Sequence, residues 1–65
     1  MIVRVEEVRN TDTVLVVDEL SRYLGKMFFS DFADCIVKDS EPIEEDNYLF
    51  WHVNKEQIKK YLDVK

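Results

Sequence analysis

The first twenty residues contain two stretches rich in aliphatic and β-branched side chains, separated by polar turn residues, and this pattern predicts a β-hairpin. "IVRVEEV" (2–8) is rich in β-branched residues and partly alternates, and "VLVVDEL" (14–20) begins with four aliphatic residues, so each predicts a strand. The intervening "RNTDT" (9–13) contains Asn and Asp, whose side chains bond to the backbone of tight turns. We therefore expect the two strands to pair.

The end of the chain changes to helical spacing. Asn54 stands where a helix N-cap is expected and Gln57 follows three residues later, which is the pattern of a capping box. Val53 and Ile58 occupy the two hydrophobic-staple positions around this cap, and lysines gather toward the C-terminus, where the helix dipole favours cations. These signals predict a short helix over 55–63.

The segment before this helix predicts a loop followed by a strand. "YLFWHV" (48–53) has the aromatic and β-branched content of a strand. "DSEPIEED" (39–46) predicts a loop, because Pro42 lacks a backbone N–H and five acids without a base repel one another in a packed element.

The middle of the chain, "RYLGKMFFSDF" (22–32), allows two interpretations. In the first, a helix at about 19–33 gives an α+β domain of order ββαββα; its apolar stripe comprises Leu20, Leu24, Met27, Phe28, Phe32 and Cys35. In the second, 18–25 is an ordered loop that ends in a turn at Gly25, and "KMFFSDF" (26–32) is a strand paired with "DCIVKD" (34–39). We favour the second, because Phe29 falls off the stripe and a glycine inside a helix costs about 1 kcal/mol relative to alanine.

With that choice, the succession "VLVVDELSRYLGKMF", "DCIVKD" and "YLFWHVNKEQIKKYL" resembles small SH3-like barrels, including KOW-type barrels and versions found in phage and prophage genomes. The resemblance covers roughly residues 13–63 and is carried mainly by "YLGK" and "FWHVNKEQIKKYL". It implies a mainly β fold: a small, partly open barrel with an N-terminal β-hairpin and a short C-terminal helix. The extra strand at 2–8 and the lack of a second glycine after the first turn depart from the family pattern.

Length and charge narrow the class of protein. Sixty-five residues predict a single domain, 1–65, and a formal charge of −5 disfavours direct binding to nucleic acid. The charge is concentrated, with nine acids and three bases between Asp18 and Asp46.

The longest aliphatic run is four residues, Val14 to Val17, so we expect no membrane association. The single cysteine, Cys35, fits a reducing compartment, and we expect the protein in the cytoplasm.

The residues that could carry chemistry are few. One glycine cannot build a phosphate-binding loop, and one histidine with one cysteine cannot make a zinc site. Cys35 falls in an apolar pattern typical of a small buried side chain, and we expect His52 to be a half-exposed strand residue, so a Cys–His nucleophilic pair is disfavoured. We therefore expect no enzyme activity, cofactor or metal.

A partner-binding surface is the remaining hypothesis. Alternation in the strand 48–53 places Leu49, Trp51 and Val53 on one face, which we assign to the core because the staple holds Val53 there. The other face then presents aromatic anchors beside the acidic loop, and we predict that a basic protein surface binds Glu41, Glu44, Glu45, Asp46, Tyr48 and Phe50.

Two functions fit this surface. The first is a small acidic interaction module without enzyme activity, such as a phage or prophage accessory protein that modulates a host factor. The alternative is an acidic decoy that occupies a nucleic-acid-binding groove of its target protein. Exposed strand edges also allow a homodimer.

Overall fold

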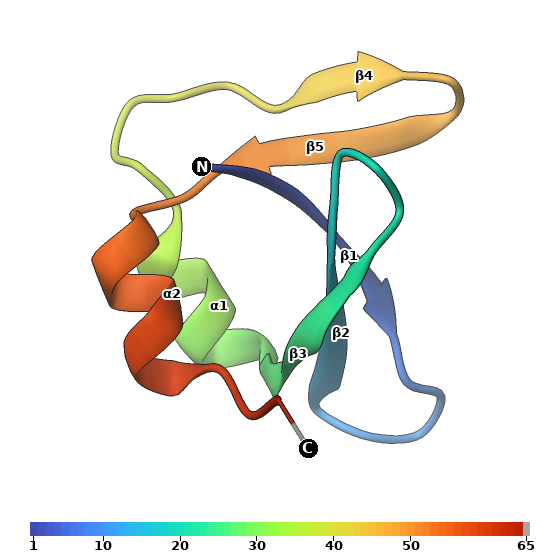
Figure 1. The fold of residues 1–65 in the computed structure, drawn as a ribbon, viewed down its shortest axis with the longest axis vertical. Helices are drawn as coiled ribbons and strands as arrows, with labels where there is room; N and C mark the ends of the chain where they lie inside the picture. The colour runs from blue at the N-terminus through green and yellow to red at the C-terminus, as the bar shows by residue number, and fades with distance from the viewer. Residues whose placement is uncertain (65) are drawn as a thin grey trace.

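The computed structural model of the protein describes residues 1–64. Within these residues, five strands form one antiparallel sheet in the order β3-β2-β1-β5-β4, and the sheet does not close on itself. Figure 1 shows the two helices lying side by side against one face of this curled sheet. The predicted mainly β class, a small, partly open barrel with an N-terminal hairpin and a C-terminal helix, is confirmed.

The N-terminal hairpin forms as predicted. β1 (Ile2–Glu7) pairs with β2 (Thr13–Asp18) over a register that runs from Val3 opposite Asp18 to Glu7 opposite Val14. In the turn between them Asn10 has a positive φ of 63°, a conformation that asparagine tolerates better than most residues. Strands and turn therefore follow from local sequence alone.

The middle of the chain follows neither interpretation. β3 (Tyr23–Phe28) pairs with β2, and the chain then turns directly into α1 (Phe29–Cys35). Three predictions for this segment are therefore wrong: the strand at 26–32, its hairpin with 34–39, and the alternative helix at 19–33.

The apolar stripe misled because it spans two elements. Met27 is buried from β3, whereas Phe32 and Cys35, three residues apart, are buried from one face of α1. Phe28 and Phe29, at the junction, are 61% and 54% exposed, so neither aromatic ring holds the junction in the core. The helical spacing was thus real only from Phe32 onward.

Gly25 lies inside β3 instead of in a turn. Its φ is +153°, and a Cβ built on it would lie 2.7 Å from the carbonyl oxygen of Asp63 and 2.8 Å from Cγ of Leu62. The backbone after the last helix pairs with β3 at this point through an isolated antiparallel bridge: the N–H of Lys26 donates to the Asp63 carbonyl at 2.7 Å, and the N–H of Asp63 donates to the Lys26 carbonyl at 2.8 Å. Glycine therefore allows the C-terminal backbone to cover the edge of β3.

The C-terminal helix begins at the predicted cap. α2 (Lys55–Tyr61) starts after Asn54, whose Oδ1 accepts a hydrogen bond from the Gln57 N–H at 2.9 Å. The helix ends two residues before the predicted boundary at 63. The N–H of Asn54 donates to the Cys35 carbonyl, so this donor ties α2 to the end of α1. Val53 and Ile58, the staple pair, are both in the core.

The remaining strands are a hairpin at the far edge of the sheet. β5 (Tyr48–His52) pairs with β1 and with the short β4 (Ile43–Glu45), which lies inside the segment predicted to be a loop. Asp46 and Asn47 connect β4 to β5 with positive φ values of 51° and 69°, as a two-residue hairpin turn requires. All three residues of β4 are exposed, so the carboxylates of Glu44 and Glu45 stay hydrated and destabilise the strand little.

The sheet has two faces with different roles. One face packs with the helices into a core; its buried residues are Val3, Val14, Val16, Met27, Phe32, Cys35, Val53 and Ile58. Trp51 packs against this core, as predicted for its face, but Leu49 is 43% exposed and lies outside it. Pairing of Ile2 with His52 puts Ile2, Phe50 and Tyr48 together on the opposite face.

Candidate functional site

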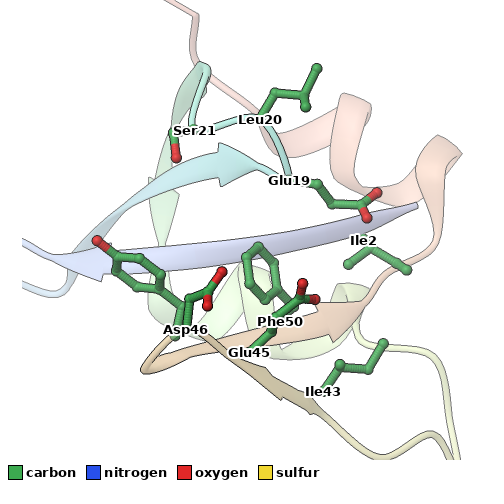
Figure 2. Close-up of a pocket in the computed structure, with 9 residues that line it drawn as sticks. Ile2, Glu19, Leu20, Ser21, Ile43, Glu45, Asp46 and Phe50 are labelled. Carbon is green, nitrogen blue, oxygen red and sulfur yellow. The ribbon is translucent and has the colours of Figure 1, made fainter.

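The face opposite the core contains a hollow of about 340 Å³. Figure 2 shows it between the β2–β3 loop and the β4–β5 hairpin, with β1 running between the two. Its lining residues come from β1, that loop and that hairpin, and they are Ile2, Glu19, Leu20, Ser21, Ile43, Glu45, Asp46, Tyr48 and Phe50.

One wall is the β2–β3 loop, which Asp18 holds in shape. Its Oδ1 accepts hydrogen bonds from the backbone N–H groups of Leu20 and Arg22, both at 2.9 Å, and its Oδ2 accepts from Nε of Arg22 at 2.8 Å. These bonds, the backbone N–H of Arg22 first among them, hold the pKa of the Asp18 carboxyl below its usual value. Ser21 adopts a φ of 62° in the same loop. Glu19 and Leu20 are thus presented by an ordered loop.

The other wall is the β4–β5 hairpin, and alternation along β4 decides which acid faces the hollow. Ile43 and Glu45 are two residues apart and both line it, whereas Glu44, between them, points to the opposite side of the strand. Asp46, in the two-residue turn, adds a second carboxylate to this wall.

The floor is apolar and aromatic. Ile2 of β1 and Phe50 of β5 are half-buried, and the Tyr48 and Phe50 rings meet edge to face with 6.5 Å between their centroids. The guanidinium carbon of Arg4 lies 4.2 Å from the Tyr48 ring centroid, and Nη1 of Arg4 is 2.9 Å from Oε1 of Glu6. Arg4 is only 7% exposed, so this stack fixes Tyr48 against the sheet.

The predicted partner-binding residues are therefore only partly brought together. Glu45, Asp46, Tyr48 and Phe50 line one hollow, but Glu41 and Glu44 do not line it. Sequence reasoning predicted an ordered loop at 18–25 but did not predict that it forms a wall of this hollow, because the approach of residues 19–21 to 43–50 depends on the curl of the sheet. A signal was present in Asp18, whose side chain is of a type that stabilises turns.

Charge in the hollow has one sign. Glu19, Glu45 and Asp46 contribute carboxylates, and within residues 1–64 no lysine or arginine lines it. The nearby guanidinium of Arg4 is already paired with Glu6. An apolar floor with an acidic rim suits a ligand that is both apolar and positively charged.

The groups considered for catalysis lie elsewhere. Cys35 is fully buried at the end of α1, and burial, followed by the charges of Asp31 and Asp34, raises the pKa of its thiol. A raised pKa disfavours the thiolate that a nucleophile needs. His52 is half-buried at the end of β5, as predicted. Among residues 1–64, no three His, Cys, Asp or Glu side chains are grouped to hold a metal ion.

Fold and site together define a small β domain with a surface hollow suited to cationic ligands. The chain matches no protein-family model, no curated protein and no solved structure. Within residues 1–64, no helix has the length and apolar character needed to cross a membrane.

Proposed function

We propose that this protein is an interaction module without enzyme activity, and that the hollow binds a basic surface of another protein. The observation that supports this most directly is the juxtaposition of Glu19 on the β2–β3 loop with Glu45 and Asp46 on the β4–β5 hairpin, around an aromatic floor. Aromatic side chains at the centre of a contact supply affinity, and like charges at its rim accelerate association with an oppositely charged partner.

The same proposal includes the biological setting suggested by the sequence. A cytoplasmic phage or prophage accessory protein that binds a host factor agrees with the SH3-like resemblance and with the free, buried Cys35. The alternative is an acidic decoy that occupies a nucleic-acid-binding groove of its target protein. It is supported by the nine acids and three bases between Asp18 and Asp46. The two differ in whether the hollow or the overall charge selects the partner.

Capture from a bacterial lysate with the immobilised chain separates these functions. An interaction module retains a discrete partner as the salt concentration rises, because apolar contacts are not screened. Glu45→Lys should then slow association with that partner, while Glu44→Lys, one residue away and on the other side of β4, should have a smaller effect.

Other outcomes contradict the proposal. Several basic proteins that elute together at moderate salt, with equal losses for Glu44→Lys and Glu45→Lys, would support the decoy instead. Capture that is unchanged by Glu45→Lys would mean that the hollow is not the binding surface. Both variants change exposed side chains, so equal thermal midpoints to the parent chain are the control for folding.

A further inference from the structure

The hollow has the size and layering of a site for one long cationic side chain. Its volume of about 340 Å³ is near the lower end of the range for ligand pockets, roughly 300–1,000 Å³. Ile2 and Phe50 provide apolar surface for a methylene stem, and the acidic residues Glu19, Glu45 and Asp46 line the same hollow. Lysine and arginine are the side chains that bury an apolar stem while keeping a charged end at the rim.

Arginine fits this environment better than lysine. Its planar guanidinium stacks on aromatic rings and pairs with carboxylates through several N–H donors, whereas lysine presents a strongly hydrated point charge. The chain contains an internal example at the edge of the hollow, where Arg4 stacks on Tyr48 at 4.2 Å and pairs with Glu6 at 2.9 Å. Phe50, edge to face with Tyr48, offers the next aromatic surface, and Glu45 and Asp46 lie on the adjoining hairpin.

Both walls are fixed before a ligand arrives. Asp18 holds the β2–β3 loop through two backbone hydrogen bonds and one to the Arg22 side chain. Two residues with positive φ, Asp46 and Asn47, form the tight turn of the hairpin. A site that needs no ordering on binding loses less conformational entropy, so even one side chain can bind measurably.

We propose that the hollow is an arginine-binding pocket, into which a single arginine side chain of a basic partner segment inserts. The Phe50 ring and Ile2 contact its stem and guanidinium plane, and Glu19, Glu45 and Asp46 receive its charge. This inference rests on the proposed function, since it names the side chain that the interaction module recognises.

The test is a ¹H–¹⁵N correlation NMR titration of the full chain with three small probes: N-acetyl-arginine amide, N-acetyl-lysine amide and the uncharged N-acetyl-citrulline amide. We expect the arginine probe to shift the amide signals of Glu19, Leu20, Glu45, Asp46 and Phe50, with millimolar affinity. The lysine probe should bind more weakly and citrulline should cause no saturable shifts, because it keeps the planar shape but loses the charge.

Two adjacent glutamates provide a matched pair of variants. Glu45→Gln should weaken the arginine probe by about twofold to fivefold, the range for one exposed ion pair. Glu44→Gln removes the same charge from the same strand on its other side and should leave the affinity within error. Phe50→Leu keeps apolar volume while removing the ring, and should abolish the preference for arginine over lysine.

Each contrary outcome identifies what has failed. Equal binding of arginine and lysine, together with equal losses for Glu44→Gln and Glu45→Gln, would refute the arginine pocket while leaving a basic partner in place. The absence of saturable shifts in the hollow with any probe would refute the pocket as well. Failure of the proposed function, binding of a basic protein surface, would appear separately: the unaltered chain would then capture no discrete partner. Should Phe50→Leu fail to fold, the two exposed glutamine variants still decide the question.

Discussion

Replacing Gly25 with alanine tests how the C-terminal backbone is held against the sheet. Gly25 has a φ of +153°, which L-residues rarely adopt, and strain of this kind costs about 1–3 kcal/mol. The new Cβ would also lie 2.7 Å from the Asp63 carbonyl oxygen, so the backbone at Asp63 must move away. That movement weakens the two hydrogen bonds between Lys26 and Asp63, each worth about 0.5–1.5 kcal/mol.

The expected loss is therefore about 2–6 kcal/mol, a large part of the stability of a domain of this size. Urea unfolding followed by the fluorescence of Trp51 would measure it. With an m-value of about 1 kcal/mol per M, the midpoint of Gly25→Ala should fall by about 2 M or more. A midpoint within about 0.5 M of the parent would refute both the strain and the close approach, since either alone exceeds that value.

A second substitution tests the contact between the new Cβ and the side chain of Leu62. Cγ of Leu62 lies 2.8 Å from the position of the new Cβ, so Leu62→Ala removes one of the two close contacts. The double variant should then lose less stability than the sum of the single variants. Strict additivity would indicate that the contact with Leu62 contributes nothing, and that backbone strain and the contact with the Asp63 carbonyl oxygen account for the loss.

The elements that sequence predicted well are those specified by neighbouring residues. The N-terminal hairpin, the strand that became β5 and the cap at Asn54 each depend on side chains within a few positions of one another. Sequence could also assign Trp51 and Val53 to the core face, because alternation fixes which side chains share a face once one of them is anchored.

The elements that sequence mistook are those decided by distant contacts or by weak local signals. Gly25 resembles a turn residue locally, but its reason lies in Asp63, thirty-eight positions away in the chain. The helix α1 buries only Phe32 and Cys35 and lacks a side-chain N-cap, so it has little local signal. β4 is held by pairing with β5 across Asp46 and Asn47, a turn whose positive φ values were not inferred from the sequence.

For the candidate site too, sequence predicted residues that are close in the chain and did not predict contacts made only by the fold. Glu45, Asp46, Tyr48 and Phe50 were predicted together because they are close in the chain, and the hairpin does place them around one hollow. Glu44 was included by proximity, although period-two alternation turns it away. The β2–β3 loop could not be predicted as the opposite wall, because only the curl of the sheet brings it there.

Three further predictions concern the cap, the thiol and the loop that forms one wall of the hollow. Asn54→Ala should lower the urea midpoint by an amount equivalent to about 1 kcal/mol, with Asn54→Asp as the control that keeps an acceptor for the Gln57 N–H; equal midpoints for all three chains would mean that the cap contributes nothing. Cys35 should resist alkylation in the folded chain at neutral pH and react fully in urea, because it is buried and its pKa is raised; rapid labelling without denaturant would contradict this. Asp18→Asn should lower the thermal midpoint at neutral pH, because the hydrogen bonds to Arg22 and Leu20 favour the charged carboxylate and hold its pKa below the ordinary value of 3.8. A carboxyl group whose pKa is lower in the folded state than in the unfolded state stabilises the fold at pH values above its unfolded-state pKa. That stabilisation is lost as the pH falls through the folded-state pKa. The difference between the parent chain and Asp18→Asn should therefore be constant from pH 7 down to about pH 5 and shrink below pH 3.8. A difference that stays the same at low pH would show that the shape of the side chain, and not its charge, orders the β2–β3 loop.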